Sequence, residues 1–420
     1  MITRTELLPD VFLTAVQTEK FKTGCFSINL LRPLCREEAA KNALLPAVLL
    51  RGCREYPDIR SISARLDELF GASMGVLVRK NGEVQLTGLY CDFAEDALAG
   101  TPVFAPMADF TARLLLHPLE ENGAFLPEIV EGEKQNLLNA IASRINDKRA
   151  YAYSELRKRM CENEAFGIER TGEAEDAAAI DETELFAHYR GVLTHSRIEI
   201  FYMGRSPAQQ AAEVMRAVLS ELPRGPVVSA STEVVRTAGE PRRFVQTMDV
   251  TQGKLAMGFR TGCSVGDAEY PALVMLNAVF GSGMTSKLFR KVREEMSLCY
   301  YASSSVNKYK GVMFVSSGIE FSEYETARRE ILHQLDECRA GNITDAELES
   351  ARRYLLSNLR MGMDSPGRMD DFYVGQAACG QNGTMETLAE QLRTVTREQV
   401  AQAARRVRLD AEFFLKGESA

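Results

Sequence analysis

The fold is decided by the stretch Gly281-Ser-Gly-Met-Thr-Ser-Lys-Leu-Phe-Arg-Lys-Val-Arg-Glu-Glu-Met-Ser-Leu-Cys-Tyr300. Its two glycines predict a tight turn, and an amphipathic helix is expected over Ser286–Glu295. The turn lacks the G-x-x-x-x-G-K-S/T spacing of a phosphate-binding loop, and it joins two helices instead of a strand and a helix. We therefore expect a plain turn here and no nucleotide site.

The elements around this stretch recur in the same order in both halves of the chain. Each half shows an apolar strand, an apolar helix, an amphipathic helix and a second strand. This repeat indicates two duplicated domains. In the first half the four patterns cover Cys25–Leu31, Ala43–Leu50, Ile62–Phe70 and Val84–Tyr90. In the second half they cover Lys254–Phe259, Pro271–Phe280, Ser286–Glu295 and Val312–Gly318.

Long charged helices follow in each half, and regular strand–helix–strand alternation is missing, which is typical of α+β domains. We expect each domain to be an antiparallel-rich sheet covered by helices. Turn formers and small polar residues interrupt the periodic pattern over residues 222–240. The predicted organisation is therefore an N-terminal domain (1–221), a linker (222–240) and a C-terminal domain (241–420).

Composition limits the partners and the compartment. The net charge of -8, from 50 basic and 58 acidic residues, gives no reason to expect nucleic acid or an anionic membrane as a partner. The nine cysteines are an odd number without C-x-x-C spacing, which favours a reducing compartment. The longest apolar run, Leu44–Leu50, is far too short to span a bilayer, and no signal peptide is visible. We expect a cytoplasmic protein.

Two segments carry a family resemblance. The stretch Gly281–Tyr300 resembles the second-domain signature of the insulinase/pitrilysin (inverzincin) zinc peptidases, in which a glycine-rich turn precedes a helix ending L-R-E-x-x-G-L-x-Y. The family's arginine and tyrosine fall on Arg293 and Tyr300. The segment Asn42–Asp58 resembles the first-domain segment, where the catalytic helix is followed by a Gly-Thr-x-x-x-Pro-like exit. The resemblance implies two insulinase-like domains that form half of a clamshell.

The zinc motif of the family is lost in this chain. H-x-x-E-H places two imidazole ligands one helical turn apart, with a glutamate that takes a proton from the metal-bound water. Ala43 and Ala47 stand at the ligand positions, and Pro46 stands at the position of the base. The third ligand, a glutamate, aligns with Ala140 or Asn139. We therefore expect no metal, no cofactor and no catalytic residue in this chain.

The remaining candidates for chemistry have structural explanations. His188 and His195 are expected at a helix end and in the next strand, and His117 and His333 as packing or surface residues. The run Ser303–Ser305 lacks a G-x-S-x-G elbow, so a polar strand face is the better interpretation. Burial among apolar residues would raise the pKa of Cys299 and leave its thiol inert.

The resemblance also implies a function. In family members built from separate subunits, the arginine–tyrosine pair reaches a zinc held by the other chain, so Arg293 and Tyr300 would contact the substrate of a partner subunit. The loop Gly281-Ser282-Gly283 would line the peptide chamber. The implied partner is an H-x-x-E-H subunit that carries the zinc in a heterodimer, with a peptide or small protein as substrate. The sequence leaves open whether the chain forms a homodimer when alone.

Two hypotheses remain. Among bacterial family members, the chain resembles the non-catalytic subunit associated with the 5-aminopentanol modification of elongation factor P. The alternative is a structural or peptide-binding protein without a role in proteolysis, like the core subunits of respiratory complexes. The two hypotheses differ in whether Arg293 and Tyr300 matter for turnover.

Overall fold

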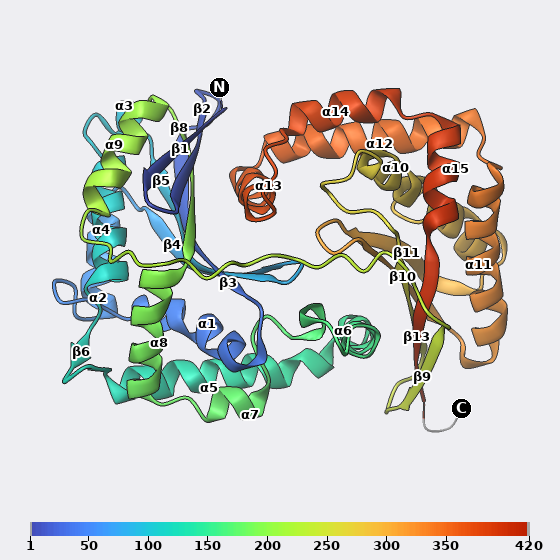
Figure 1. Ribbon diagram of the computed structural model, residues 1–420, viewed down its shortest axis with the longest axis horizontal. Helices are drawn as coiled ribbons and strands as arrows, with labels where there is room; N and C mark the ends of the chain where they lie inside the picture. The colour runs from blue at the N-terminus through green and yellow to red at the C-terminus, as the bar shows by residue number, and fades with distance from the viewer. Residues whose placement is uncertain (1, 418–420) are drawn as a thin grey trace. The chain divides into compact units, whose positions relative to one another are not determined.

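The computed structural model describes residues 2–417 and shows two β-sheets with helices packed on both faces (Figure 1). The chain forms two compact units, and each unit draws on both halves of the sequence. Unit 1 contains the chain up to Ala142, together with Ile168–Ser231 and Pro366–Asn382. Unit 2 contains Ser143–Gly167, Thr232–Ser365 and the chain from Gly383 onward.

The sheet of unit 1 has the strand order β1-β2-β8-β3-β5-β4. Only the β2–β8 pair is parallel among its described pairs, and the others are antiparallel. The strands are β1 (Ile2–Leu8), β2 (Val11–Gln17), β3 (Thr23–Pro33), β4 (Ser73–Asn81), β5 (Val84–Ala94) and β8 (Arg197–Gly204). A separate ribbon joins β6 (Glu120–Glu121) to β7 (Ala124–Phe125).

The sheet of unit 2 repeats this plan. Its strand order is β11-β12-β10-β13-β9, and β13–β9 is the parallel pair, as β8–β2 is in unit 1. The matching order supports the duplication that the sequence repeat predicts. The strands are β9 (Arg242–Thr247), β10 (Gly253–Arg260), β11 (Cys299–Asn307), β12 (Val312–Ile319) and β13 (Arg408–Lys416).

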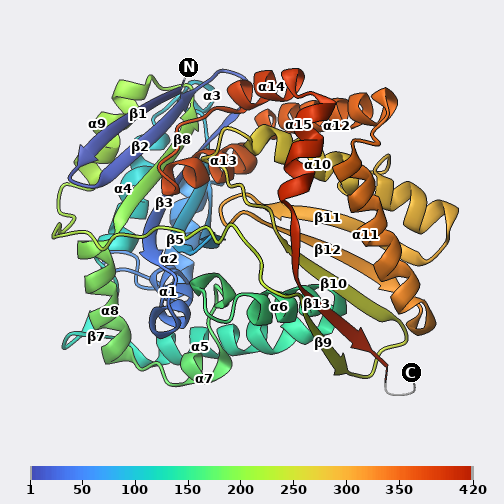
Figure 2. The ribbon, with the colours of Figure 1, turned by 45° about the vertical axis from the view of Figure 1, so that its right-hand side comes forward.

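Helices cover one face of each sheet with segments from the same half of the chain (Figures 1 and 2). The helices of unit 1 are α1 (Arg36–Leu49), α2 (Ile59–Glu68), α3 (Asp96–Ala99), α4 (Phe104–Leu116), α5 (Pro127–Ser143), α7 (Ala174–Ala178), α8 (Glu182–His195) and α9 (Ala208–Val218). Unit 2 has α10 (Tyr270–Phe280), α11 (Tyr324–Ala340), α12 (Asp345–Met363), α14 (Met385–Thr394) and α15 (Arg397–Arg406). A π-helix covers Leu288–Glu295, and short 3-10 turns cover Arg144–Asn146, Ala165–Gly167 and Phe321–Glu323.

The other face of each sheet receives a helix from the opposite half of the sequence. Helix α13 (Pro366–Ala378) packs on β3 and β8 of unit 1, and helix α6 (Lys148–Met160) packs on β10, β12 and β13 of unit 2. On α6 the buried residues Leu156 and Met160 join a core cluster with Phe314 of β12 and Phe413 of β13. Neither sheet would have its second face covered without this exchange.

A carboxylate with cationic partners fixes each exchanged segment, and it is buried in α13 and partly buried after α6. On α13, Asp370 is 0% exposed. Its carboxylate accepts a hydrogen bond from Ser27 Oγ at 2.5 Å and forms an ion pair with Arg79. After the end of α6, the Glu164 carboxylate forms an ion pair with Lys310 Nζ at 2.6 Å and a second ion pair with Arg260. The Lys310 side chain is 0% exposed. Removing one partner of such a pair leaves an uncompensated buried charge, so both contacts specify where the helix docks.

The predicted α+β class is confirmed, and each of the eight strand and helix patterns that define the repeat falls on an element of the same type. Among residues 2–417, no helix combines the length and the apolar character that a bilayer crossing requires. All nine cysteines are free, and seven of them are buried.

Candidate functional site

Helix α1 carries Ala43, Pro46 and Ala47, the residues that the family resemblance aligns with the zinc motif. Ala43 and Pro46 are buried and Ala47 is partly exposed, so the positions of both ligands and of the base lie on an intact helix. A methyl group cannot coordinate a metal, and a proline ring cannot accept a proton. The residues present therefore do not fit zinc.

Pro46 creates a backbone defect that the fold repairs. Proline lacks an N–H, so the carbonyl of Asn42, four residues earlier, loses its helical hydrogen bond. The hydroxyl of Thr87 on β5 donates to that carbonyl at 2.6 Å. Both residues are buried. The proline, which the resemblance aligns with the catalytic base, is thus accommodated by a hydrogen bond between helix and sheet.

The side chain of Asn42 extends this contact into a polar network. Its amide donates to Gln85 Oε1 at 2.9 Å, and its Oδ1 lies 2.8 Å from His188 Nε2. Burial lowers the pKa of His188 from 6.5 to about 4, although Glu38 opposes this shift. The imidazole is therefore neutral at pH 7 and donates to Asn42.

The expected placement of the two neighbouring histidines was wrong. His188 and His195 both lie on α8, which runs through Gly191, whereas the sequence suggested a helix end and the next strand. The helix continues because Tyr189, Val192 and Leu193 are buried on it. His195 Nδ1 contacts the Pro226 carbonyl at 2.9 Å, so the two rings have different partners and act as packing residues.

Ala140 lies on α5, where it is exposed. In Figure 1, α1 and α5 run side by side in opposite directions, and an ion pair joins Arg51, just after α1, to Glu133 of α5. Ala140 follows Glu133 by two helical turns, about 10 Å along the axis. Within residues 2–417, no group of three His, Cys, Asp or Glu side chains is placed to hold a metal ion.

Arg293 lies on the π-helix Leu288–Glu295, within the helix predicted over Ser286–Glu295. π-Helical turns are rare and occur frequently at functional sites. The guanidinium is exposed and lies 4.6 Å from the centre of the Phe289 ring. A cation–π contact of this kind orients the group without consuming its N–H donors.

Two further backbone features lie between Arg293 and Tyr300. Ser297 adopts a φ of 52°, in the left-handed region, at the position of the signature's glycine. The β11–β12 register then jumps from Cys299 to Tyr301, so Tyr300 is the extra residue of a β-bulge. Bulges redirect a side chain and recur next to active sites. Tyr300 is 70% exposed, which presents its hydroxyl to solvent.

The loop Gly281-Ser282-Gly283 lies between α10 and the π-helix and borders a pocket of about 480 Å³ in unit 2. Gly281 approaches β11 so closely that a Cβ atom would lie 2.6 Å from Ser304 Oγ. Its carbonyl accepts the Ser304 N–H at 2.9 Å. The loop is thus fixed to the strand that begins at the Arg293–Tyr300 segment.

Other nucleophile candidates in this region serve the structure. Burial raises the pKa of Cys299, so its thiol is inert. Ser303 Oγ accepts a 2.8 Å hydrogen bond from Arg149, and Ser304 Oγ donates to Asn277 Oδ1 at 2.7 Å. Both serines stabilise the position of β11.

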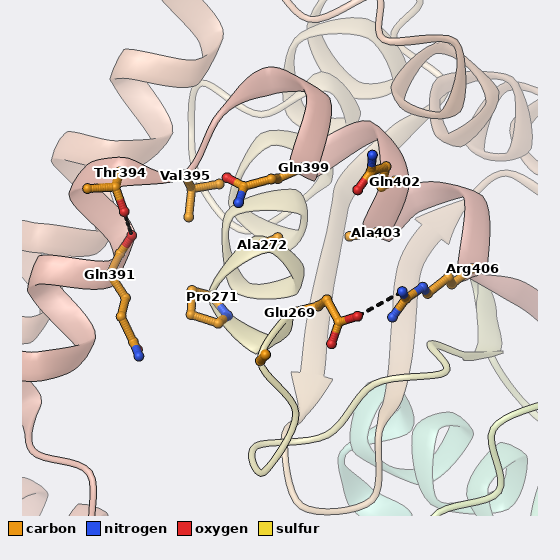
Figure 3. A pocket seen from close by; sticks show the side chains of 11 residues that line it. Glu269, Pro271, Ala272, Gln391, Thr394, Val395, Gln399, Gln402, Ala403 and Arg406 are labelled. Carbon is orange, nitrogen blue, oxygen red and sulfur yellow. Dashed lines mark hydrogen bonds and ion pairs between the residues drawn. The ribbon is translucent and has the colours of Figure 1, made fainter.

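A second pocket of unit 2, about 400 Å³, lies between the start of α10, the end of α14 and α15 (Figure 3). Its charged side chains, Glu269 and Arg406, pair with each other at 2.8 Å. Glutamine side chains such as Gln399 and Gln402 provide the other polar groups. The Glu269 carboxylate is occupied by Arg406, and the Thr394 hydroxyl donates to the Gln391 carbonyl at 2.9 Å, so the pocket is a surface hollow between helices.

Sequence reasoning missed Ser297, the bulge at Tyr300 and the pocket beside the glycine loop. The conformation of Ser297 could have been predicted from the sequence, because the L-R-E-x-x-G-L-x-Y pattern has glycine where this chain has Ser297. Glycine at such a position commonly marks a left-handed helix end. The bulge and the pocket depend on strand register and helix packing, which have no local signature.

Comparisons with known proteins agree with this picture. Residues 179–355 match the family model described as Peptidase M16 inactive domain. The chain is 29% identical over 404 residues to the probable inactive metalloprotease YmfF of Bacillus subtilis (strain 168), covering 96% of this chain and 95% of that protein.

Solved structures show the same fold. A conserved protein from Enterococcus faecalis V583 superposes with a TM-score of 0.91 at 28% identity, covering 100% of this chain and 99% of that one. A peptidase M16 inactive domain from Pseudomonas fluorescens superposes with a TM-score of 0.82 at 16% identity, covering 99% of this chain and 98% of that one.

Proposed function

Because the chain is a non-catalytic member of the insulinase/pitrilysin (M16) peptidase family, we propose that it supplies Arg293 and Tyr300 to the zinc site of a partner subunit. The two chains would form one heterodimeric peptidase, in which the partner carries H-x-x-E-H and the zinc. The chain would also contribute the loop Gly281-Ser282-Gly283 to the peptide chamber.

One observation carries the proposal. The zinc positions Ala43, Pro46, Ala47 and Ala140 hold no usable ligand or base, yet the segment from Arg293 to Tyr300 keeps a π-helix, a left-handed serine and a β-bulge. A left-handed non-glycine residue is costly, and all three features recur at functional sites. Their combined effect is to present a guanidinium and a phenol to solvent.

The chemistry of this pair suits peptide-bond hydrolysis in the partner's site. Both groups donate hydrogen bonds, and the guanidinium is permanently charged. They would bind the scissile carbonyl and then the oxyanion of the tetrahedral intermediate, where negative charge develops. Because this charge is absent in the ground state, the pair would raise turnover more than substrate affinity.

The test is Tyr300→Phe in the co-purified complex of this chain with its H-x-x-E-H partner. Loss of one such donor typically reduces turnover about a hundred- to a thousand-fold. The ring is retained, so assembly and the zinc content of the partner should not change. As a control, Tyr56→Phe removes a hydroxyl from a partly exposed tyrosine of unit 1, keeps the ring that packs against Phe110 and should leave turnover unchanged.

Wild-type turnover of the Tyr300→Phe complex would favour the alternative, a structural or peptide-binding protein of the same fold. Arg293→Ala is the second variant, with its complex checked first for integrity because the aliphatic stem is lost as well.

We further propose that the substrate is linked to the 5-aminopentanol modification of elongation factor P. This link is supported by the resemblance to the bacterial subunit associated with that modification. Mass spectrometry of elongation factor P from cells without this chain tests it, since the mass of the modification should change only if the link holds.

A further inference from the structure

The pocket beside the glycine loop has apolar walls. Met284 from the loop, Phe289 from the π-helix and Tyr354 from α12 line it, and its volume is about 480 Å³. Met284 is 78% exposed, which is unusual for so apolar a side chain on a protein surface. Methionine adapts its shape to different apolar groups. The pocket can therefore hold a large apolar side chain.

Gly283 keeps the pocket open. A Cβ atom built on Gly283 would make ordinary contact with the Tyr354 ring, at 3.8 Å from Cδ1, and its φ is not positive. A side chain is thus sterically allowed at this position and would point at the tyrosine ring. The glycine leaves space that leucine would fill.

The charge of the pocket is positive. Among the described residues that line the pocket, Arg353 of α12 is the one with a charged side chain. Its hydrogen bonds go to neutral acceptors, the Glu349 carbonyl at 3.4 Å and Ser350 Oγ at 3.5 Å. A guanidinium with neutral partners is available to a carboxylate, with which it can form a bidentate pair.

The adjacent strand limits how far a peptide can extend. β11 is at the edge of its sheet, where an extended chain can add by backbone pairing. The Ser304 N–H, however, is already used by the Gly281 carbonyl at 2.9 Å. A chain lying along β11 from Tyr300 therefore cannot pair beyond the glycine loop and ends at the pocket.

We propose that this pocket binds the C-terminal residue of a peptide. Its large apolar side chain lies among Met284, Phe289 and Tyr354, and its terminal carboxylate pairs with Arg353. This inference rests on the proposed function, in which the glycine loop lines a peptide chamber. Peptides with a new free carboxylate are the products of peptide-bond hydrolysis, so the pocket retains or selects one product of the partner's reaction.

The experiment uses the purified full chain with ¹³C-methyl methionine and nuclear magnetic resonance, the Met284 signal being assigned by its loss in Met284→Leu. The probes are acetyl-Gly-Phe with a free carboxylate, its carboxamide, and acetyl-Gly-Ala with a free carboxylate. Acetyl-Gly-Phe acid should shift the Met284 signal saturably, with an affinity about tenfold or more above that of either other probe.

Three variants separate the two parts of the pocket. Gly283→Leu should abolish the shift for all probes. Arg353→Gln should equalise the acid and the amide while keeping the preference for phenylalanine over alanine. Arg360→Gln, two turns further along α12 and outside the lining, is the matched control and should behave as wild type. The signals of the other methionines report whether each variant is folded.

Equal affinity for the acid and the amide in the wild type, or wild-type binding by folded Gly283→Leu, would overturn the inference. The assay needs neither the partner nor turnover, so it fails independently of the proposed function. If the pocket distinguishes the free acid from the carboxamide while the Tyr300→Phe complex stays active, the chain is a peptide-binding protein without a role in turnover. If Tyr300→Phe abolishes turnover but the pocket binds the acid and the amide equally, the pocket inference is wrong and the proposed function stands.

Discussion

Ser297 adopts a strained backbone conformation three residues before the exposed Tyr300. Its φ of 52° is disfavoured for a residue with a Cβ atom, by roughly 1 kcal/mol. Ser297→Gly should therefore stabilise the chain by about this amount and raise its Tm. Ser305→Gly on β11 is the control and should destabilise it by about 0.5–1 kcal/mol, because glycine weakens a strand interior. Thermal unfolding of both variants measures the difference, and a lower Tm for Ser297→Gly contradicts the assignment of strain.

His188 makes stability depend on pH. Burial lowers its pKa from 6.5 to about 4, with Glu38 and Glu184 raising it and Lys41 and Arg32 lowering it. The neutral ring is favoured in the folded state, so its contribution is complete above pH 6.5 and is lost as pH falls toward 4. The expected slope is up to about 1.4 kcal/mol per pH unit in that window.

His188→Gln keeps a donor for Asn42 but does not titrate. Denaturant unfolding at several pH values should therefore show a shallower loss of stability below pH 6.5 for the variant than for the wild type. Parallel curves would mean that the folded ring takes up a proton as easily as the unfolded one.

At the residue scale, side-chain chemistry could be predicted but backbone geometry could not. The expectation that Ala43, Pro46 and Ala47 bind no metal needed only their side-chain chemistry, because alanine and proline have no donor atoms whatever the fold. The misplacement of His195 came from Gly191, which suggested a turn. A Cβ atom there would meet nothing within 4 Å, so no close contact requires this glycine, and it costs the helix only about 1 kcal/mol.

Helix α1 depends on the sheet for one of its hydrogen bonds. Thr87→Val removes the hydroxyl that serves the Asn42 carbonyl and should cost about 1–3 kcal/mol, since that carbonyl is buried. In a Pro46→Ala background the amide of residue 46 can serve the carbonyl, so the same substitution should cost less.

A double-mutant cycle from denaturant unfolding measures this coupling. Additive effects of the two substitutions would show that Thr87 does not compensate for Pro46. Thr111→Val on α4 is a suitable control, because its hydroxyl donates to the Met107 carbonyl of the same helix at 2.8 Å and should not couple to Pro46.

At the element scale, strands and helices follow from periodicity, but their partners do not. β10 and α10 were predictable because apolar residues run through them almost without interruption. The pattern of α6 predicts a helix with one apolar face and gives no information about which sheet buries it. The anchors Glu164 and Asp370 resemble ordinary surface acids in the sequence, and only their partners Lys310 and Arg79 show their role.

At the scale of the whole molecule, the proposed partnership predicts a stoichiometry. Co-expression with the zinc-bearing subunit should give a one-to-one complex of about twice the 46.6 kDa of this chain, if the partner has a similar length. Light scattering after size-exclusion chromatography measures the mass, and metal analysis should find zinc only in the partner. Two chains that elute separately at micromolar concentration would contradict the heterodimer.

The exchange of α6 and α13 has a consequence for biosynthesis. The last strand of unit 1 ends at Gly204, but the helix that covers its second face ends at Ala378. Translation at about 5–20 residues per second leaves roughly 10–35 s during which the finished sheet waits for this helix. The face that α13 will cover, where Ser27 meets Asp370 and Phe201 meets Tyr373, stays exposed on the nascent chain for that time, so unit 1 is not complete before residue 378 has been synthesised.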